Sequence, residues 1–234
     1  MKYDFFNYGK VSELGKLVNR RFTAHIVKEV LRHRTHLCNK LVEIGPGRGA
    51  MLDMLSSKGF LCSWVDPSPC KTVEKKYPGR ISRVPDKMLN LESNYYDFVL
   101  AVNVLEHVYN HNEAVEFVKW CNFVLKKHGS LVLCVPDYQD YGTKFYTIPD
   151  HSYPTTPHGI GILISEYGFE KVSGFHIYGG IKGDIGKVLW FTVRLALSIL
   201  WYILPDSIRY SRAFEKADQI YRGNYVSVWR KSNG

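Results

Sequence analysis

Apolar residues follow two alternating patterns along the chain, short continuous runs and longer stretches with helical spacing. The continuous runs predict strands at 40–44, 60–65, 80–84, 96–102, 130–135, 169–178 and 224–230. Apolar residues spaced three and four apart predict helices at 12–34, where Ser12 is the expected cap, and at 50–58, 70–76, 113–125 and 158–167. Nearly continuous apolar strands that alternate with helices indicate a parallel sheet covered by helices on both faces.

The 44 residues 180–223 separate the last two predicted strands and are far more than a hairpin requires. They contain the apolar run 188–204, which as a helix spans about 25 Å, against roughly 30 Å for a membrane's hydrocarbon core. Arg194 lies near its centre, where a charge is costly in lipid. The pattern favours an amphipathic helix. Four roles remain possible for this helix: it packs on the domain, contacts a second subunit, contacts a membrane surface, or spans a membrane.

Polar and apolar side chains of this run are unevenly spread around the predicted helix. The polar ones fall near one face and are Lys187, Arg194, Ser198 and Tyr202. Apolar surface of this size usually marks a contact. We therefore expect Trp190, Leu197 and Trp201 to carry the contact, so that their loss would abolish binding to a membrane.

The composition is that of a globular protein, with 45% hydrophobic and 23% charged residues. It excludes a largely disordered, collagen-like or low-complexity chain. The net charge of +9 is concentrated at the ends, because residues 1–40 carry +6 and residues 181–234 carry +5, whereas residues 41–180 carry −2. Basic flanks suit anionic lipid, a phosphorylated substrate or nucleic acid. Nucleic acid is the disfavoured partner, because no recognition module for it is visible.

The five cysteines, Cys38, Cys62, Cys70, Cys121 and Cys134, form no CxxC pair, and their number is odd. This usage indicates reduced thiols in a cytosolic protein and argues against a disulfide framework or a metal site of cysteines. The N-terminus has no long apolar segment of the secretory type. We therefore expect a cytoplasmic protein, in solution or peripheral at the inner face of a membrane.

A glycine-rich turn follows the first predicted strand, in the sequence Leu41-Val42-Glu43-Ile44-Gly45-Pro46-Gly47-Arg48-Gly49. Glycine lets a backbone approach a ligand closely and adopt positive φ. The spacing is GxGxG with an acid two residues before the first glycine. It is neither the pyrophosphate fingerprint GxGxxG nor a P-loop, which ends in GK[ST].

Three further features follow in order. Asp66 ends the second predicted strand, 17 residues beyond Gly49, and the stretches 96–108 and 129–133 supply a fourth and a fifth strand with the turn between them. Over residues 38–180 and 224–231 the chain resembles class I S-adenosylmethionine-dependent methyltransferases. The resemblance implies an α/β fold with a doubly wound, seven-stranded, mostly parallel, Rossmann-like sheet whose last strand is antiparallel. We expect one domain, 1–234, with an N-terminal helical flank, 1–37, and a helical insertion or cap, 180–223.

The resemblance also implies the cofactor, S-adenosyl-L-methionine, and the residues that hold it. Glu43, Gly45, Gly47 and Gly49 would cradle its methionine part, Asp66 would bind the ribose hydroxyls, Asp86 within Pro85–Lys87 would contact adenine, and Asn103 would face the cofactor or the substrate. The cofactor carries an activated methyl group, so the protein mainly aligns donor and acceptor.

A catalytic base helps only when the acceptor must lose a proton, as a hydroxyl does. The candidates are His107, His111, His151 and His158; His151 is the first choice and His107 the second, whereas Glu106 is expected to cap or anchor a turn. The expected acceptor is a hydroxyl of a lipid-linked surface-glycan sugar, and a soluble natural product or quinone-like lipid precursor is the alternative. A binding protein that keeps the fold without catalysis is the alternative of another class, and the complete glycine turn with Asp66 argues against it.

Overall fold

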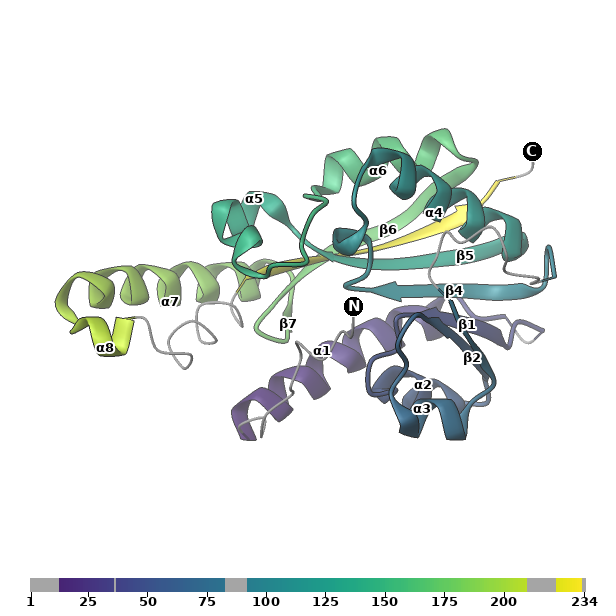
Figure 1. Cartoon of the computed structure of the whole chain (residues 1–234), viewed down its shortest axis with the longest axis horizontal. Helices are drawn as coiled ribbons and strands as arrows, with labels where there is room; N and C mark the ends of the chain where they lie inside the picture. The colour runs from purple at the N-terminus through teal and green to yellow at the C-terminus, as the bar shows by residue number, and fades with distance from the viewer. Residues whose placement is uncertain (1–12, 36, 83–91, 210–221, 233–234) are drawn as a thin grey trace.

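The computed structural model describes residues 13–35, 37–82, 92–209 and 222–232. The predicted cap Ser12 and the predicted adenine contact Asp86 lie outside these described residues. The strands are β1 (Lys40–Ile44), β2 (Leu61–Asp66), β3 (Gly79–Ile81), β4 (Tyr96–Val102), β5 (Leu125–Pro136), β6 (Phe169–Tyr178), β7 (Ile181–Lys182) and β8 (Gly223–Lys231). They form one eight-stranded sheet in the order β3-β2-β1-β4-β5-β8-β6-β7 (Figure 1).

The sheet is parallel from β3 to β5, and β8 runs antiparallel between β5 and β6. This arrangement confirms the predicted fold class. The sheet has one strand more than the seven predicted, because Gly179 and Gly180, both at positive φ, let the chain turn back and pair β7 with β6. β5 also begins five residues before the predicted strand, with an irregularity in its pairing to β4 between Tyr96 and Phe98.

The α-helices are α1 (Glu13–Arg32), α2 (Ala50–Ser56), α3 (Lys71–Lys76), α4 (His111–Val124), α5 (Tyr138–Tyr141), α6 (Pro157–Glu166), α7 (Asp184–Ile203) and α8 (Asp206–Arg209). Two short 3-10 helices, η1 (Leu105–His107) and η2 (Gly142–Thr147), lie in the connections. Figure 1 shows α1, α2 and α3 on one face of the sheet and α4 and α6 on the other.

Successive side chains of β4 point alternately into two hydrophobic cores, one on each face of the sheet. Phe98 and Leu100 pack in the core beneath α1, α2 and α3, whereas Val99 and Ala101 pack in the core beneath α4 and α6. All four side chains are at most 2% exposed. A strand buried on both faces needs this continuous apolar sequence, so the prediction from the pattern succeeded here.

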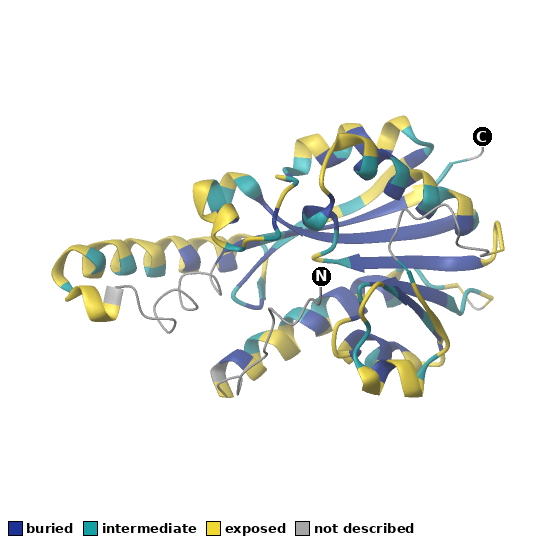
Figure 2. Cartoon of the chain, in the orientation of Figure 1, coloured by how far each residue is buried: buried dark blue, intermediate teal, exposed yellow. Residues whose placement is uncertain are grey.

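α7 extends away from the sheet and is mostly exposed (Figures 1 and 2). Its inner face holds Trp190, which is 6% exposed and packs its ring 5.7 Å from that of Tyr178. The other face is apolar and exposed, and it includes Val188, Leu195 and Ile199, with exposed fractions of 65%, 54% and 54%.

The choice of Trp190 as a contact residue for an outside partner was therefore wrong, because this side chain already anchors α7 to β6. By length and composition α7 is the one described helix that could cross a membrane. The structure describes α7 and α8 inside the predicted insertion 180–223, and the division into flank, domain and insertion stays a prediction.

Candidate active site

The glycine turn connects the end of β1 to the start of α2. Gly45, Gly47 and Gly49 all have positive φ, at 65°, 53° and 80°. A Cβ atom at Gly45 would lie 2.8 Å from Val104 Cγ2, and one at Gly49 would lie 2.7 Å from Val73 Cγ2. A Cβ atom at Gly47 would meet nothing within 4 Å, so this glycine faces open space.

A cavity of about 380 Å³ opens beside this turn, at the edge of the sheet where β1 and β4 end. This is a usual volume for a small-molecule site. Six of the predicted site residues line it: Glu43, Gly45, Gly47, Asn103, His107 and His151. Gly49 and Asp66 do not line the cavity.

Glu43 lies at the floor of the cavity, near the end of β1. Its side chain is 3% exposed, and its Oε2 atom has no hydrogen-bond partner among the described residues. Burial raises its pKa to about 8. A buried carboxyl group without a partner is costly, so this position is built to receive a donor from a ligand.

Asn103 and Asp66 lie at the ends of β4 and β2. Asn103 has a φ of 54°, a conformation that asparagine tolerates better than most residues, and its N–H donates to the Cys134 carbonyl over 2.8 Å. Asp66 Oδ1 accepts the Ser68 N–H over 2.7 Å, and burial raises the pKa of this carboxyl group. The predicted ribose contact of Asp66 stays a prediction.

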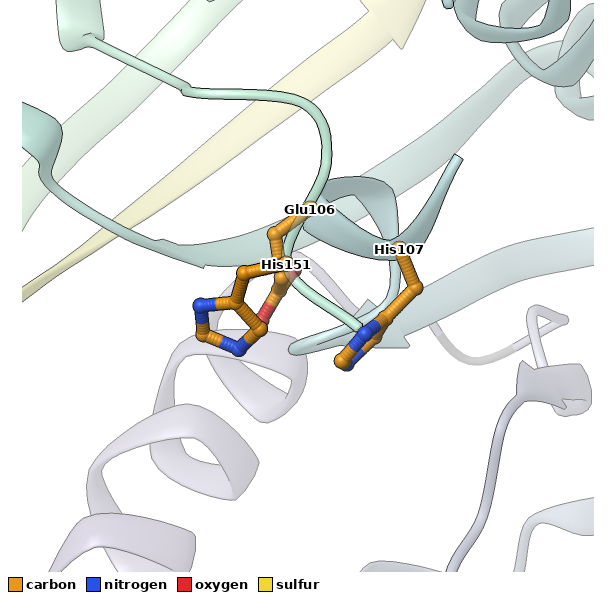
Figure 3. A group of neighbouring side chains, drawn as sticks. All are labelled: Glu106, His107 and His151. Atoms are coloured by element: carbon orange, nitrogen blue, oxygen red, sulfur yellow. The ribbon is translucent and has the colours of Figure 1, made fainter. Parts of the chain in front are cut away.

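The turn after β4 and the loop before α6 meet at the cavity, although Glu106 and Ser152 are 46 positions apart in the sequence. The Glu106 carbonyl accepts the N–H groups of Ser152 and Tyr153 over 2.9 and 3.0 Å. These bonds hold His151 beside Glu106 and His107, and Figure 3 shows the three side chains gathered together. The His107 and His151 ring centroids are 5.0 Å apart.

Glu106 is the functional candidate that sequence reasoning missed. Its side chain lines the cavity and is 1% exposed, and neither carboxylate oxygen has a hydrogen-bond partner from another described residue. Glu106 was expected to cap or anchor a turn. Its backbone carbonyl does so, but its carboxylate binds no other described residue. Burial raises its pKa to about 8.

The predicted bases divide into two pairs. His107 Nδ1 lies 3.2 Å from both the carboxylate and the backbone carbonyl of Asp150. Burial, followed by the charge of His107, lowers the pKa of His151 to about 4, so His151 is neutral at pH 7. His111 and His158 are exposed and do not line the cavity.

Other segments also contribute to the cavity wall. Thr23 comes from α1, Tyr141 from α5 and Asn224 from β8. The sequence indicates a place in the site for these three residues only through the order of the elements, which brings their segments to one edge of the sheet. The cavity is thus closed by parts of the chain that lie outside the motifs.

A ligand cavity at the carboxyl ends of parallel strands, with a glycine turn and a buried acid, defines a cofactor-binding α/β protein. A protein-family model described as "Methyltransferase domain" matches residues 12–173. The chain belongs to this family. It is a class I S-adenosylmethionine-dependent methyltransferase, and S-adenosylmethionine is its cofactor. Among curated proteins, no sequence match is found.

Solved structures with the same fold include methyltransferases of varied substrates. A protein of Galdieria sulphuraria, provisionally described as a sarcosine dimethylglycine methyltransferase, has a TM-score of 0.64 at 16% identity, over 93% of this chain and 88% of that one. A SAM-dependent methyltransferase of Archaeoglobus fulgidus has a TM-score of 0.59 at 17% identity, over 92% and 99%. The 1,6-didemethyltoxoflavin-N1-methyltransferase of Burkholderia thailandensis, with 1,6-didemethyltoxoflavin and S-adenosylhomocysteine bound, has a TM-score of 0.60 at 13% identity, over 92% of this chain and 79% of that one. At these identities the likeness shows the fold.

The residues of the cavity fit this cofactor. The unpartnered Oε2 atom of Glu43 can accept a hydrogen bond from an ammonium group such as that of the methionine part, and the open space at Gly47 leaves room for a ligand against the backbone. When bound, the cofactor supplies a methyl group on a positively charged sulfur. The protein's part is to hold that group and the acceptor in line.

Proposed function

We propose that the protein transfers a methyl group from S-adenosylmethionine to a hydroxyl group of a sugar in a surface glycan that is carried on lipid at the inner face of a membrane. The observation that carries this proposal is the group Glu106, His107 and His151, which shares one cavity with the glycine turn. A hydroxyl group must lose its proton as the methyl group arrives. These three side chains are placed to promote that loss.

The exposed face of α7 supports a lipid-linked acceptor. Val188, Leu195 and Ile199 lie on its outer side, away from the Trp190 anchor. Figure 1 shows α7 and α1 projecting beyond the edge of the sheet where β4 ends, which is the edge with the cavity. An apolar helix face in this place suits insertion into the interface of a bilayer.

Exposed basic side chains on α1 and α7 suit an anionic bilayer. Arg20 and Arg21 of α1 and Lys187 and Arg194 of α7 are exposed. Arg21 lies near the start of α7, because a Cβ atom placed on Gly180, just before this helix, would be 3.2 Å from the Cβ atom of Arg21. Each basic group near an anionic surface contributes about 1 kcal/mol of attraction, which salt weakens.

The acceptor class is tested with labelled cofactor and a membrane extract divided into a lipid-linked glycan fraction and a water-soluble fraction. We expect label on a sugar hydroxyl released from the lipid-linked fraction. Label in a soluble natural product or in a quinone-like lipid would favour the alternative acceptors. Cofactor binding without transfer to any fraction would favour a non-catalytic protein.

The membrane contact is tested by sedimentation with vesicles that contain phosphatidylglycerol. We expect the protein to sediment in low salt, to be released as salt rises, and to lose vesicle binding when Val188, Leu195 and Ile199 are replaced by Ser. The control replaces three exposed apolar residues elsewhere, Leu61, Ile81 and Ile162, and should bind normally. If the wild type ignores vesicles and is a dimer that the α7 variant dissociates, the face is a subunit contact instead.

A further inference from the structure

We infer that Glu106, His107 and His151 form a binding site for a divalent transition-metal ion of the Mn²⁺ or Zn²⁺ class, which holds the acceptor oxygen. Each residue offers one ligand atom, and the three atoms lie within 4.8 Å of one another. The inference rests on the proposed hydroxyl acceptor. It adds a metal to a site that the sequence assigned to histidine bases alone.

The carboxylate of Glu106 is the observation that points to a cation. It lines the cavity at 1% exposure, and neither of its oxygens has a hydrogen-bond partner from another described residue. An isolated buried carboxylate costs several kcal/mol unless it is paired or coordinates a metal. A bound cation would supply the missing partner of this carboxylate.

His107 is oriented as a metal ligand. Its Nδ1 faces two acceptors, the Asp150 carboxylate and the Asp150 carbonyl, each at 3.2 Å. Nδ1 therefore carries the hydrogen, and the lone pair of Nε2 is left for a cation. A carboxylate behind a ligating histidine is the usual second partner in metal sites, where it fixes the ring and raises its basicity.

The donor set indicates the kind of metal. Two imidazoles and one carboxylate suit Mn²⁺, Fe²⁺ or Zn²⁺, whereas sites for Mg²⁺ and Ca²⁺ use mainly oxygen donors. Three protein ligands leave positions open on the ion. Neighbouring hydroxyl groups of a sugar can fill such positions.

A second group of possible ligands, Asp137, Asp140 and His176, serves as a comparison. Asp137 accepts the Gln139 N–H over 3.0 Å and lies 2.8 Å from His176 Nε2. Both of its oxygens are thus in use within the protein. The Glu106 carboxylate has no such partner from another described residue, so its group is the better cation site.

The metal would make the acceptor hydroxyl more acidic, as a Lewis acid does. The hydroxyl proton passes to solvent water, and the oxygen forms a bond to the methyl carbon. The bond between that carbon and sulfur breaks, and its electron pair stays on sulfur. The products are the methyl ether, S-adenosylhomocysteine and one proton.

The test is a titration of chelator-treated protein with Mn²⁺ in the presence of S-adenosylhomocysteine, followed by the electron paramagnetic resonance signal of free Mn²⁺. Mn²⁺ is chosen because carboxylate and imidazole bind it, whereas thiols prefer softer metals. We expect one ion per chain, with affinity reduced at least tenfold in Glu106→Gln and in His151→Ala. His158→Ala removes an exposed histidine outside the group and should leave the affinity unchanged.

The outcomes separate this inference from the proposed function. Absent binding, or equal binding by the wild type and Glu106→Gln, overturns the metal site, and so does full methylation by metal-free protein. Binding without methylation of any hydroxyl overturns the proposed function and leaves the metal site standing. If Glu106→Gln no longer binds S-adenosylhomocysteine, His107→Ala replaces it in the same comparison.

Discussion

Replacing the buried carboxyl group of Glu43 by an amide should stabilise the free protein and weaken its binding of the cofactor. Burial raises the pKa of Glu43 to about 8, from an ordinary value of 4.5. The side chain is 3% exposed, and its Oε2 has no partner among the described residues. Glu43→Gln keeps the shape of the side chain and removes the titration.

The size of the effect follows from linkage between protonation and folding. Below about pH 4.5 the carboxyl group is protonated in both the folded and the unfolded chain, so burial has no ionisation cost. As pH rises from 4.5 toward 8, the unfolded chain ionises first and stability is lost by about 1.4 kcal/mol per pH unit. At pH 7 the accumulated loss is about 3 kcal/mol.

Urea unfolding at a series of pH values measures this loss. Relative to the wild type, Glu43→Gln should gain about 3 kcal/mol of unfolding free energy between pH 4.5 and pH 7. Glu166→Gln, at an exposed position, should give no such pH-dependent gain. Parallel curves for the wild type and Glu43→Gln would refute the argument from burial.

Binding of S-adenosylhomocysteine gives the second half of this prediction. Loss of a charge-assisted hydrogen bond costs about 1.5–3 kcal/mol, so Glu43→Gln should bind roughly 10- to 100-fold more weakly at pH 7 by calorimetry. A variant that is more stable but binds equally well would remove Glu43 from the cofactor site.

Three further substitutions test the glycine turn and the ribose contact. Gly47→Ala should cost about 1–3 kcal/mol of stability, because φ is 53°, and should weaken S-adenosylhomocysteine binding at least tenfold because the new methyl group enters the cavity; equal affinity in calorimetry would contradict this. Gly49→Ala should instead lose mainly stability in urea, because its Cβ would strike Val73. Asp66→Ala should weaken calorimetric binding by about 1–3 kcal/mol, and a normal dissociation constant would place the ribose contact elsewhere.

The strands and the glycine turn could be predicted because their signals are local. A strand buried on both faces is continuously apolar, as 96–102 is, and a turn with positive φ at alternate positions selects the glycines of the GxGxG sequence. The edge strand β7 has two residues and no such signal. Its pairing depends on β6, so the sequence alone predicted seven strands.

The role of Glu106 could not be predicted for a different reason. Glu106 lies in the recognisable stretch 96–108, but its burial depends on Ser152 and Tyr153, whose N–H groups bind its backbone carbonyl from a loop far along the chain. The two faces of α7 are a similar case. Both are apolar, and only the packing of Trp190 on Tyr178 decides which of them remains exposed.

The most direct measurement of the central claim is the stoichiometry of methyl transfer to a lipid-linked glycan extract. Purified protein, labelled S-adenosylmethionine and the extract are mixed, and S-adenosylhomocysteine and the released sugars are quantified together by mass spectrometry. The account predicts one O-methylated sugar for each S-adenosylhomocysteine, with a mass gain of about 14 Da as a methyl group replaces a proton. Turnover of the cofactor without an O-methylated sugar, or label on nitrogen or carbon, would contradict it.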